Sequence, residues 1–317
     1  MCPLSTDCPR TGWTVDFRPD LAHFSMRIWS WNIARRSAAW KAIADDTSLD
    51  VALLQEATPP SPQVPLHGLD VTPGREERWA TSGSTRDYRT AIAWRRQRID
   101  ADVRQLGCIG DDVERSLCVS RTGTLTALDV HLPDGDLTLI SAYGFWETPR
   151  SEKKQPWIYA DASAHRIISD ISALIDSERD HRILLAGDFN ILHGYGEHGS
   201  EYWKARYATV FSRFDALGFS FVGPQARNNE RQAVPWPKEL PLHSKNVPTY
   251  HTNRQTPDTA TRQLDFVFAS NSIANRIRVR AINGIADWGP SDHCRVEIVI
   301  ESEPTLSQRL PLKTQVF

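Results

Sequence analysis

A short apolar run that ends abruptly in polar residues is the feature that most constrains the fold of this chain. Residues 183–186 read Ile-Leu-Leu-Ala, and they are followed at once by Gly187, Asp188, Phe189 and Asn190. Such a run is typical of a strand that is buried on both faces of its sheet. Because side chains two residues apart on an extended chain point the same way, we expect Asp188 and Asn190 to meet at the end of this strand and Phe189 to enter the core.

The polar residues at this strand end have two interpretations. A carboxylate beside a carboxamide suits a hydrated divalent cation and a phosphate oxygen, which indicates a functional site. Gly, Asp and Asn are also common turn formers, so a plain turn accounts for the same residues. The other strand ends of the chain decide between the two.

Composition places the chain among ordinary globular proteins. Its 317 residues are 40% hydrophobic and carry a net charge of −2, so the whole molecule has no strong field that attracts nucleic acid. The five cysteines are irregularly spaced and form no C-x-x-C pair, which argues against a zinc ribbon and favours reduced thiols. No signal peptide and no membrane-spanning apolar run is visible, so we expect a cytoplasmic protein with no membrane association and no obligate protein partner.

Apolar patterns predict two series of strands, each accompanied by helices. Strands are expected at residues 26–33, 51–54, 89–94, 98–106, 117–131, 137–143, 183–186, 249–251, 263–269, 276–283 and 295–301, and helices at 34–44, 156–176 and 201–217. This order favours one α/β domain at 26–301, with two sheets packed face to face and helices outside. An arm at 1–25 and a polar tail at 302–317 flank it, and a Pro-rich loop at 223–247 is expected near the functional site.

Several predicted strands end as the central one does, with polar side chains after an apolar run. These side chains are Asn32, Glu56, Tyr143, Asp265, Asp292 and His293. Each alone has a structural explanation, such as a turn, a solvated strand end or a satisfied buried carboxylate. Carboxylates gathered without matching lysines, however, repel one another unless a cation joins them. Oxygen ligands with no Cys and a single His favour Mg²⁺ or Mn²⁺ over zinc.

The order and spacing of these groups resemble a known superfamily. The motifs are Trp-Asn at 31–32, Leu-Leu-Gln-Glu at 53–56, Tyr143, Gly-Asp-Phe-Asn at 187–190, Leu-Asp-Phe-Val-Phe at 264–268 and Ser-Asp-His at 291–293. Together they resemble the endonuclease/exonuclease/phosphatase superfamily, which includes DNase I, exonuclease III, abasic endonucleases, neutral sphingomyelinases, inositol-polyphosphate 5-phosphatases and deadenylases. The resemblance implies a DNase I-like four-layered α/β sandwich, in which two packed mixed β-sheets are flanked by helices.

The resemblance implies a metal site at three of these residues. Glu56 is expected to be the principal ligand of the ion, with Asn32 near it and Asp292 on the other side. Some abasic endonucleases have an Asp two residues after the Asn of the first motif, whereas this chain has Ala34 there. This departure leaves the ion dependent mainly on Glu56 and argues against an abasic-site enzyme.

The resemblance also implies a set of catalytic residues. Asp188 is expected to orient or deprotonate the attacking water. Asn190 is expected to hold the phosphate or assist a second metal position, and Tyr143 to contact the phosphate. Asp265 is expected to fix the ring of His293, which stabilises the charge that builds on the phosphate oxygens. The reaction implied is an in-line displacement at a phosphodiester by water, dependent on Mg²⁺ or Mn²⁺.

DNA or RNA is the predicted substrate, since no membrane anchor of the sphingomyelinase kind and no inositol-phosphatase motif is found. Two groups of residues favour it, namely Arg86, Arg89, Arg95, Arg96 and Arg98, and then Arg150, Lys153, Lys154 and Trp157. Of these we expect Arg86, Arg89 and Arg150 to contact substrate, although a solvated charged surface explains both groups equally well. A phosphomonoesterase or a lipid or inositol phosphate phosphodiesterase stays open as an alternative. A non-catalytic binding module would be expected to lack one of the motifs.

Overall fold

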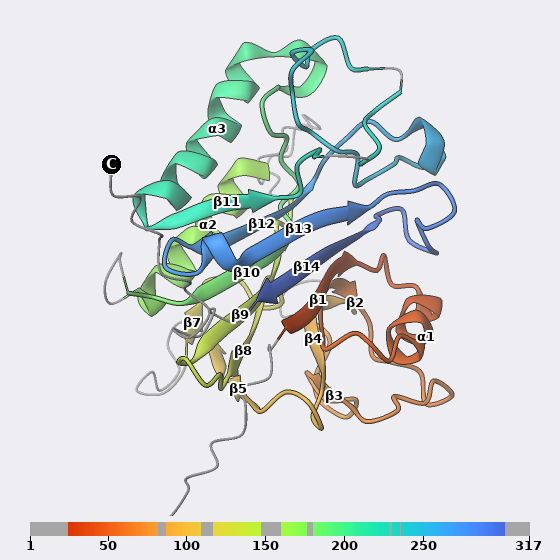
Figure 1. Ribbon diagram of the computed structural model, residues 1–317, viewed down its shortest axis with the longest axis vertical. Coiled ribbons are helices and arrows are strands. Elements are labelled where there is room, and N and C mark those ends of the chain that lie inside the picture. The colour runs from red at the N-terminus through yellow and green to blue at the C-terminus, as the bar shows by residue number, and fades with distance from the viewer. Residues whose placement is uncertain are drawn as a thin grey trace, which may run out of the picture.

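The computed structural model describes residues 25–81, 87–108, 117–146, 160–175, 180–227, 230–234 and 236–301. The predicted arm, apart from Ser25, and the predicted tail lie outside these ranges. Within them, two six-stranded sheets pack face to face, and helices cover the outer face of each sheet (Figure 1). The four-layered α/β sandwich expected from the sequence is therefore confirmed.

The first sheet has the strand order β13-β14-β1-β2-β4-β3. Its strands are β1 (Ser25–Asn32), β2 (Val51–Ala57), β3 (Leu69–Thr72), β4 (Arg89–Arg95), β13 (Ile277–Ile282) and β14 (Arg295–Glu301). β1 and β2 run parallel, and the other neighbours are antiparallel. The parallel pair brings the carboxyl ends of β1 and β2 to one edge of the sheet.

The second sheet has the order β11-β12-β10-β9-β8-β5. Its strands are β5 (Ala101–Arg104), β8 (Leu125–Val130), β9 (Leu137–Tyr143), β10 (Ile183–Asp188), β11 (Phe219–Gly223) and β12 (Asp265–Ser270). β9 and β10 run parallel, so their carboxyl ends also lie side by side, while the other neighbours are antiparallel. β6 (Leu106–Cys108) and β7 (Leu117–Val119) form a separate two-stranded sheet.

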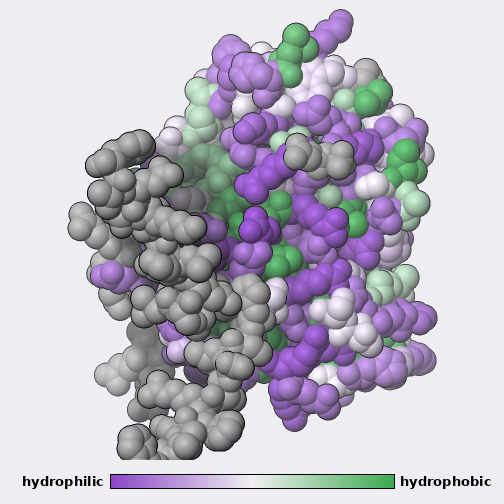
Figure 2. Space-filling view, in the orientation of Figure 1, coloured by the Kyte–Doolittle hydropathy of each residue, from purple (hydrophilic) through white to green (hydrophobic). Residues whose placement is uncertain are grey.

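The helices form the two outer layers. α1 (Ser37–Asp45) packs on the first sheet, and α2 (Ala160–Ile171) and α3 (Glu201–Ala216) pack on the second (Figure 1). Short 3₁₀ turns lie at Ser172–Leu174, Glu197–Gly199, Pro257–Thr259 and Ala274–Arg276. Among the described residues, no helix combines the length and the apolar character that crossing a membrane requires. The face in Figure 2 is mainly hydrophilic, as expected when apolar side chains are enclosed between layers.

The central strand β10 is buried on both faces, as the apolar run predicted. Leu184 and Ala186 belong to the core between the sheets, whereas Ile183 and Leu185 face the helices α2 and α3. Phe189 directly after the strand is fully buried on the helix side. Because nothing on β10 faces solvent along its length, its polar residues are confined to its end.

Some predicted elements differ from those observed. The first helix begins at Ser37 and not at Ala34, because Ala34 and Arg35 have φ values of 45° and 61°, which lie outside the range of a right-handed α-helix. The strand predicted over 117–131 is interrupted between β7 and β8, and neither β3 nor β11 was predicted. The Pro-rich loop predicted at 223–247 begins at Gly223, the last residue of β11. As predicted, its described residues after Gly223 form no helix or strand.

Gly187 lies where the backbone of β9 leaves no space for a side chain on β10. A Cβ added there would lie 1.8 Å from the carbonyl oxygen of Ala142. We expect Gly187→Ala to lower the free energy of unfolding by about 2–3 kcal/mol through backbone displacement, as measured by urea denaturation. The matched control is Gly74→Ala, whose added Cβ meets only the flexible end of Glu77 at 3.1 Å and should cost less than about 0.5 kcal/mol. Equal stability of the two variants would contradict this packing.

Candidate active site

Strand ends from both sheets meet at one edge of the sandwich. Asn32 ends β1 and Glu56 lies near the end of β2, while Tyr143 ends β9 and Asp188 ends β10. In register, Asp188 pairs with Tyr143 on one side and with Asp265, the first residue of β12, on the other. The side-chain amide of Asn32 donates a hydrogen bond of 2.9 Å to Asp188 Oδ2, which links the two sheets at this edge.

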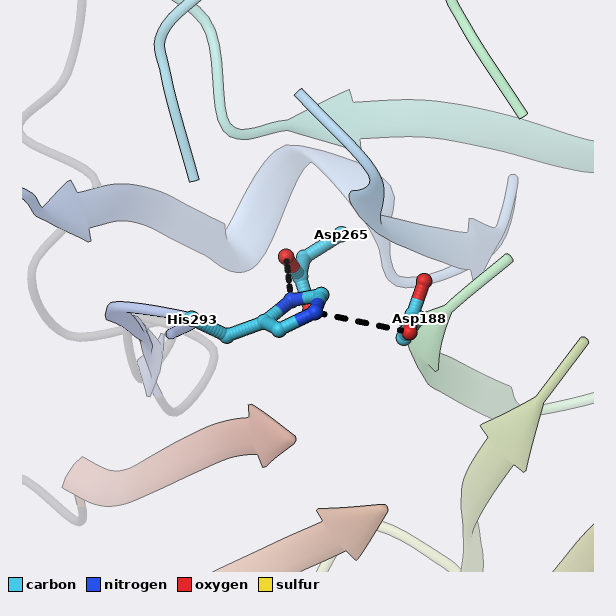
Figure 3. A group of neighbouring side chains, drawn as sticks. All are labelled: Asp188, Asp265 and His293. Carbon is cyan, nitrogen blue, oxygen red and sulfur yellow. Dashed lines mark hydrogen bonds and ion pairs between the residues drawn. The ribbon is translucent and has the colours of Figure 1, made fainter. Parts of the chain in front are cut away.

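His293 lies before β14 and points between two carboxylates of the second sheet (Figure 3). Its Nδ1 lies 2.8 Å from Asp265 Oδ2, and its Nε2 lies 3.7 Å from Asp188 Oδ2. Burial alone disfavours the charged ring, but the negative charges of Asp265 and Asp188 outweigh this effect and raise the pKa of His293. The ring is therefore protonated at neutral pH, with Nδ1 fixed by Asp265.

The carboxylate of Asp188 is held by several donors. Oδ1 accepts from the backbone N–H of Asn190 at 2.9 Å, and Oδ2 accepts from the side-chain amides of Asn32 at 2.9 Å and Asn190 at 3.3 Å. Burial raises the pKa of Asp188, and the charge of His293 opposes this shift. Asp188 and Asn190 do meet, as predicted, but through a tight turn and not along an extended chain, because Asn190 has a φ of 53°.

Glu56 is more accessible than the buried carboxylates, with 21% of its side chain exposed. Its Oε1 accepts a hydrogen bond of 2.7 Å from the Tyr143 hydroxyl, and Asn32 Nδ2 lies 3.5 Å from the same atom. Its Oε2 lies 3.9 Å from Arg35 Nε. Glu56 has a φ of 46° at the point where the register of β2 with β4 shifts, and this local distortion redirects the chain at the strand end.

A cavity of about 270 Å³ opens over these groups. Six predicted residues line it, namely Glu56, Tyr143, Asp188, Asn190, Asp292 and His293. Asn32 and Asp265 are each 1% exposed and hydrogen-bond to lining residues from behind. The structure thus brings together all eight residues that were predicted as metal ligands or catalytic groups.

Residues that the sequence did not reveal complete the lining. They are Tyr88, Trp146, Glu197, Tyr250, Arg262 and Leu264. Arg262 forms an ion pair of 3.0 Å with Glu197, and the ring of Tyr250 lies 4.8 Å from that of His293. The sequence offered one clue to these residues, which is that Arg262 stands three residues before the predicted site residue Asp265.

Of the three predicted substrate contacts, Arg89 is the one that lies among the described residues. Arg89 lines a different cavity together with Arg104. Arg86 and Arg150 lie outside the described residues. Arg89 therefore does not belong to the described lining of the carboxylate cavity, and its contact with substrate stays a prediction.

The other arginines of the predicted cationic group serve the fold. Arg95 is 9% exposed and donates to four backbone carbonyl groups, which fixes the loops around α1 and β2. Arg96 pairs with Asp70, and Arg98 lies 3.2 Å from Asp50. Arg95 is therefore not part of a cationic surface. Arg96 and Arg98 are 76% and 41% exposed, so a surface role for them stays a prediction. Lys153, Lys154 and Trp157 lie outside the described ranges.

The Pro-rich loop was also expected near the site. No described residue of 223–247 lines the cavity. Trp236 instead packs against the core of the second sheet, and its indole N–H donates to the carbonyl of Leu240. The part of the loop that the structure describes is anchored to the fold outside the cavity lining, and its influence on specificity stays a prediction.

The donors in the cavity fit a hard divalent cation. Carboxylates of Glu56, Asp188 and Asp292 line it, and Cys is absent from the described lining. The guanidinium in that lining, Arg262, is paired with Glu197. Negative charge is therefore left for a cation to compensate, and the donors are oxygens of the kind that Mg²⁺ and Mn²⁺ prefer.

A second candidate cation site lies at the buried side chains of Asp188, Asp265 and His293. One ligand-type atom each of Asp188, Asp265 and His293 lies within 4.8 Å of the others. Two of these side chains are already joined by the hydrogen bond between His293 Nδ1 and Asp265, and the charged ring repels a cation. Glu56 and Asp292 line the open cavity, so their carboxylates are the more accessible candidates for a cation.

Comparison with known proteins agrees with this geometry. The sequence model of the Endonuclease/Exonuclease/phosphatase family matches residues 29–293. No curated protein sequence matches the chain. The AP endonuclease LMAP from Leishmania major superposes with a TM-score of 0.60 at 13% identity, over 88% of each chain.

Two further solved structures share the fold. The endonuclease domain of TRAS1, a telomere-specific non-LTR retrotransposon, gives a TM-score of 0.52 at 18% identity, over 88% of this chain and 100% of that one. TDP2 of D. rerio, complexed with single-strand DNA product, gives 0.51 at 18% identity, over 88% and 99%. The family model covers most of the chain, and the chain belongs to the endonuclease/exonuclease/phosphatase family.

Proposed function

We propose that the protein hydrolyses phosphodiester bonds of DNA or RNA with Mg²⁺ or Mn²⁺. The observation that carries this proposal is the single cavity in which Glu56, Asp188 and Asp292 meet the buried pair of Asp265 and His293. Metal-dependent phosphoester hydrolysis needs this combination of anionic ligands, a water-orienting base and a fixed cationic donor. Relatives of known structure support nucleic acid as substrate, since they include endonucleases and a protein bound to single-strand DNA product.

Glu56 is proposed as the principal metal ligand, with Asn32 and Asp292 beside it. A bound Mg²⁺ or Mn²⁺ would neutralise charge on the phosphate and on the leaving oxygen. Tyr143 donates to Glu56 Oε1, while Oε2, which lies 3.9 Å from the exposed guanidinium of Arg35, would turn to the ion. Asn32 holds both Glu56 and Asp188, and this keeps the two carboxylates at a fixed separation.

Asp188 is proposed to orient the attacking water and to accept its proton. Its raised pKa suits this task, because a more basic carboxylate takes up a proton more readily. His293 presents Nε2 to the cavity and would donate a hydrogen bond to the oxygens of the pentacoordinate transition state. Asp265 holds the ring in place, and Asn190 and Tyr143 contact the phosphate.

The proposal predicts that Glu56→Ala, Asp188→Ala and His293→Ala each lose about a hundredfold or more in kcat. Initial rates are measured with labelled DNA and RNA, and with sphingomyelin and inositol phosphates, in Mg²⁺, Mn²⁺ or EDTA. The control is Glu201→Gln, whose side chain is 83% exposed on α3 and should leave the rate unchanged. Unaltered turnover in all three variants, or full activity in EDTA, would refute the mechanism. Hydrolysis of the lipid or inositol substrates alone would overturn the assignment to nucleic acid.

A further inference from the structure

Trp146 is a large aromatic side chain that has no role in the catalytic mechanism proposed above. It follows β9 by three residues, lines the cavity together with Glu56 and Asp188, and is 49% exposed. It has no ring contact and no hydrogen bond with any other described residue. An indole left open beside a reaction centre is a surface on which a ligand can gain contact area.

Other aromatic side chains gather on the side of the cavity that Trp146 lines, and we define Tyr88, Tyr143, Phe145 and Trp146 as the aromatic wall. Tyr143 and Phe145 have ring centroids 4.6 Å apart, and Tyr88 lies 6.3 Å and 6.1 Å from them. Phe145 is 2% exposed and anchors the wall in the fold. Because the Tyr143 hydroxyl bonds to Glu56, the wall begins one side chain away from the proposed metal ligand.

Two guanidinium groups lie on this wall. Arg35 lies 5.3 Å from the ring centre of Tyr88, and Arg121 lies 4.6 Å from that of Phe145. Arg35 is 57% exposed. Aromatic rings alternating with cations are the combination by which proteins hold single strands, since the rings stack on bases and the cations accompany the phosphates.

We propose that Trp146, which lines the cavity together with Tyr88, is a stacking site for an unpaired nucleobase next to the scissile phosphate. This inference rests on the proposed function and narrows its substrate to single-stranded or frayed nucleic acid. A base within a duplex has both faces covered by its neighbours, so only an unstacked base can lie flat on an indole.

The composition of the cavity favours a base over an acyl chain. The aliphatic side chain in the described lining is Leu264, which precedes β12. In the sheet order, β10 separates β12 from β9, so Leu264 and Trp146 lie on opposite sides of the Asp188 strand end. An acyl chain would lack a continuous aliphatic surface there, whereas a planar base matches the aromatic wall.

Binding is tested with a single-stranded oligonucleotide that carries 2-aminopurine, mixed rapidly with protein and Mg²⁺ so that fluorescence is recorded before turnover. We expect quenching with the wild type and with Trp146→Phe, and a loss of about tenfold to a hundredfold in affinity with Trp146→Ala. Trp146→Leu keeps apolar volume without a ring and should behave like Trp146→Ala. The control is Tyr202→Ala, which removes a 62% exposed ring from α3. Absence of quenching in the wild type would overturn the proposal.

Cleavage gives a second test that separates this proposal from the proposed function. The substrates are a single strand with all its bases and matched strands with one abasic residue beside the scissile phosphate. Trp146→Ala should lower kcat/KM on the complete strand by about tenfold or more, and should have little further effect where the stacked base is missing. Equal losses on both strands would overturn the stacking site. Quenching without cleavage of any strand would leave the stacking site standing and refute the proposed function.

Discussion

Polar contacts between the two sheets are the constraint on which the site depends. The hydrogen bond from Asn32 to Asp188 joins the end of β1 to the end of β10, and that from Tyr143 to Glu56 joins β9 to β2. Below them, the buried side chain of Gln55 donates to the hydroxyl of Ser141 at 3.0 Å. Buried polar groups have to be satisfied in one arrangement, so these contacts fix the relative position of the sheets. Carboxylates from both sheets are thereby held over a single cavity.

The sequence predicted the site well because its information is local. Asp188 follows a run that only a doubly buried strand explains, and parallel pairing then requires neighbouring strand ends to meet. The layered fold followed from the alternation of strands and helices, with boundaries displaced where residues such as Ala34 adopt positive φ. Trp146 and Arg262 were missed because they lie outside the strands, where tertiary packing and not periodicity sets the position of a side chain.

Charge counts in the sequence were a poor guide to surfaces. Arg95 reads as one of a basic group, yet it is buried and satisfies carbonyl groups. Arg96 and Arg98 have acidic partners distant in the chain, at Asp70 and Asp50. The pairing of a cation depends on contacts across more than twenty residues, which composition does not record. Counting charged side chains is informative inside the cavity, because the carboxylates of its lining outnumber the cations that the structure places beside them.

Strand ends from both sheets are proposed to share a divalent cation through Glu56. The most direct measurement is Mn²⁺ binding, followed by the loss of the free-ion electron paramagnetic resonance signal during titration of the protein. The account predicts saturable binding in the wild type and in Glu201→Gln, and at least about tenfold weaker binding in Glu56→Gln, which removes the charge and keeps the shape. Equal Mn²⁺ affinity in the wild type and Glu56→Gln would contradict it.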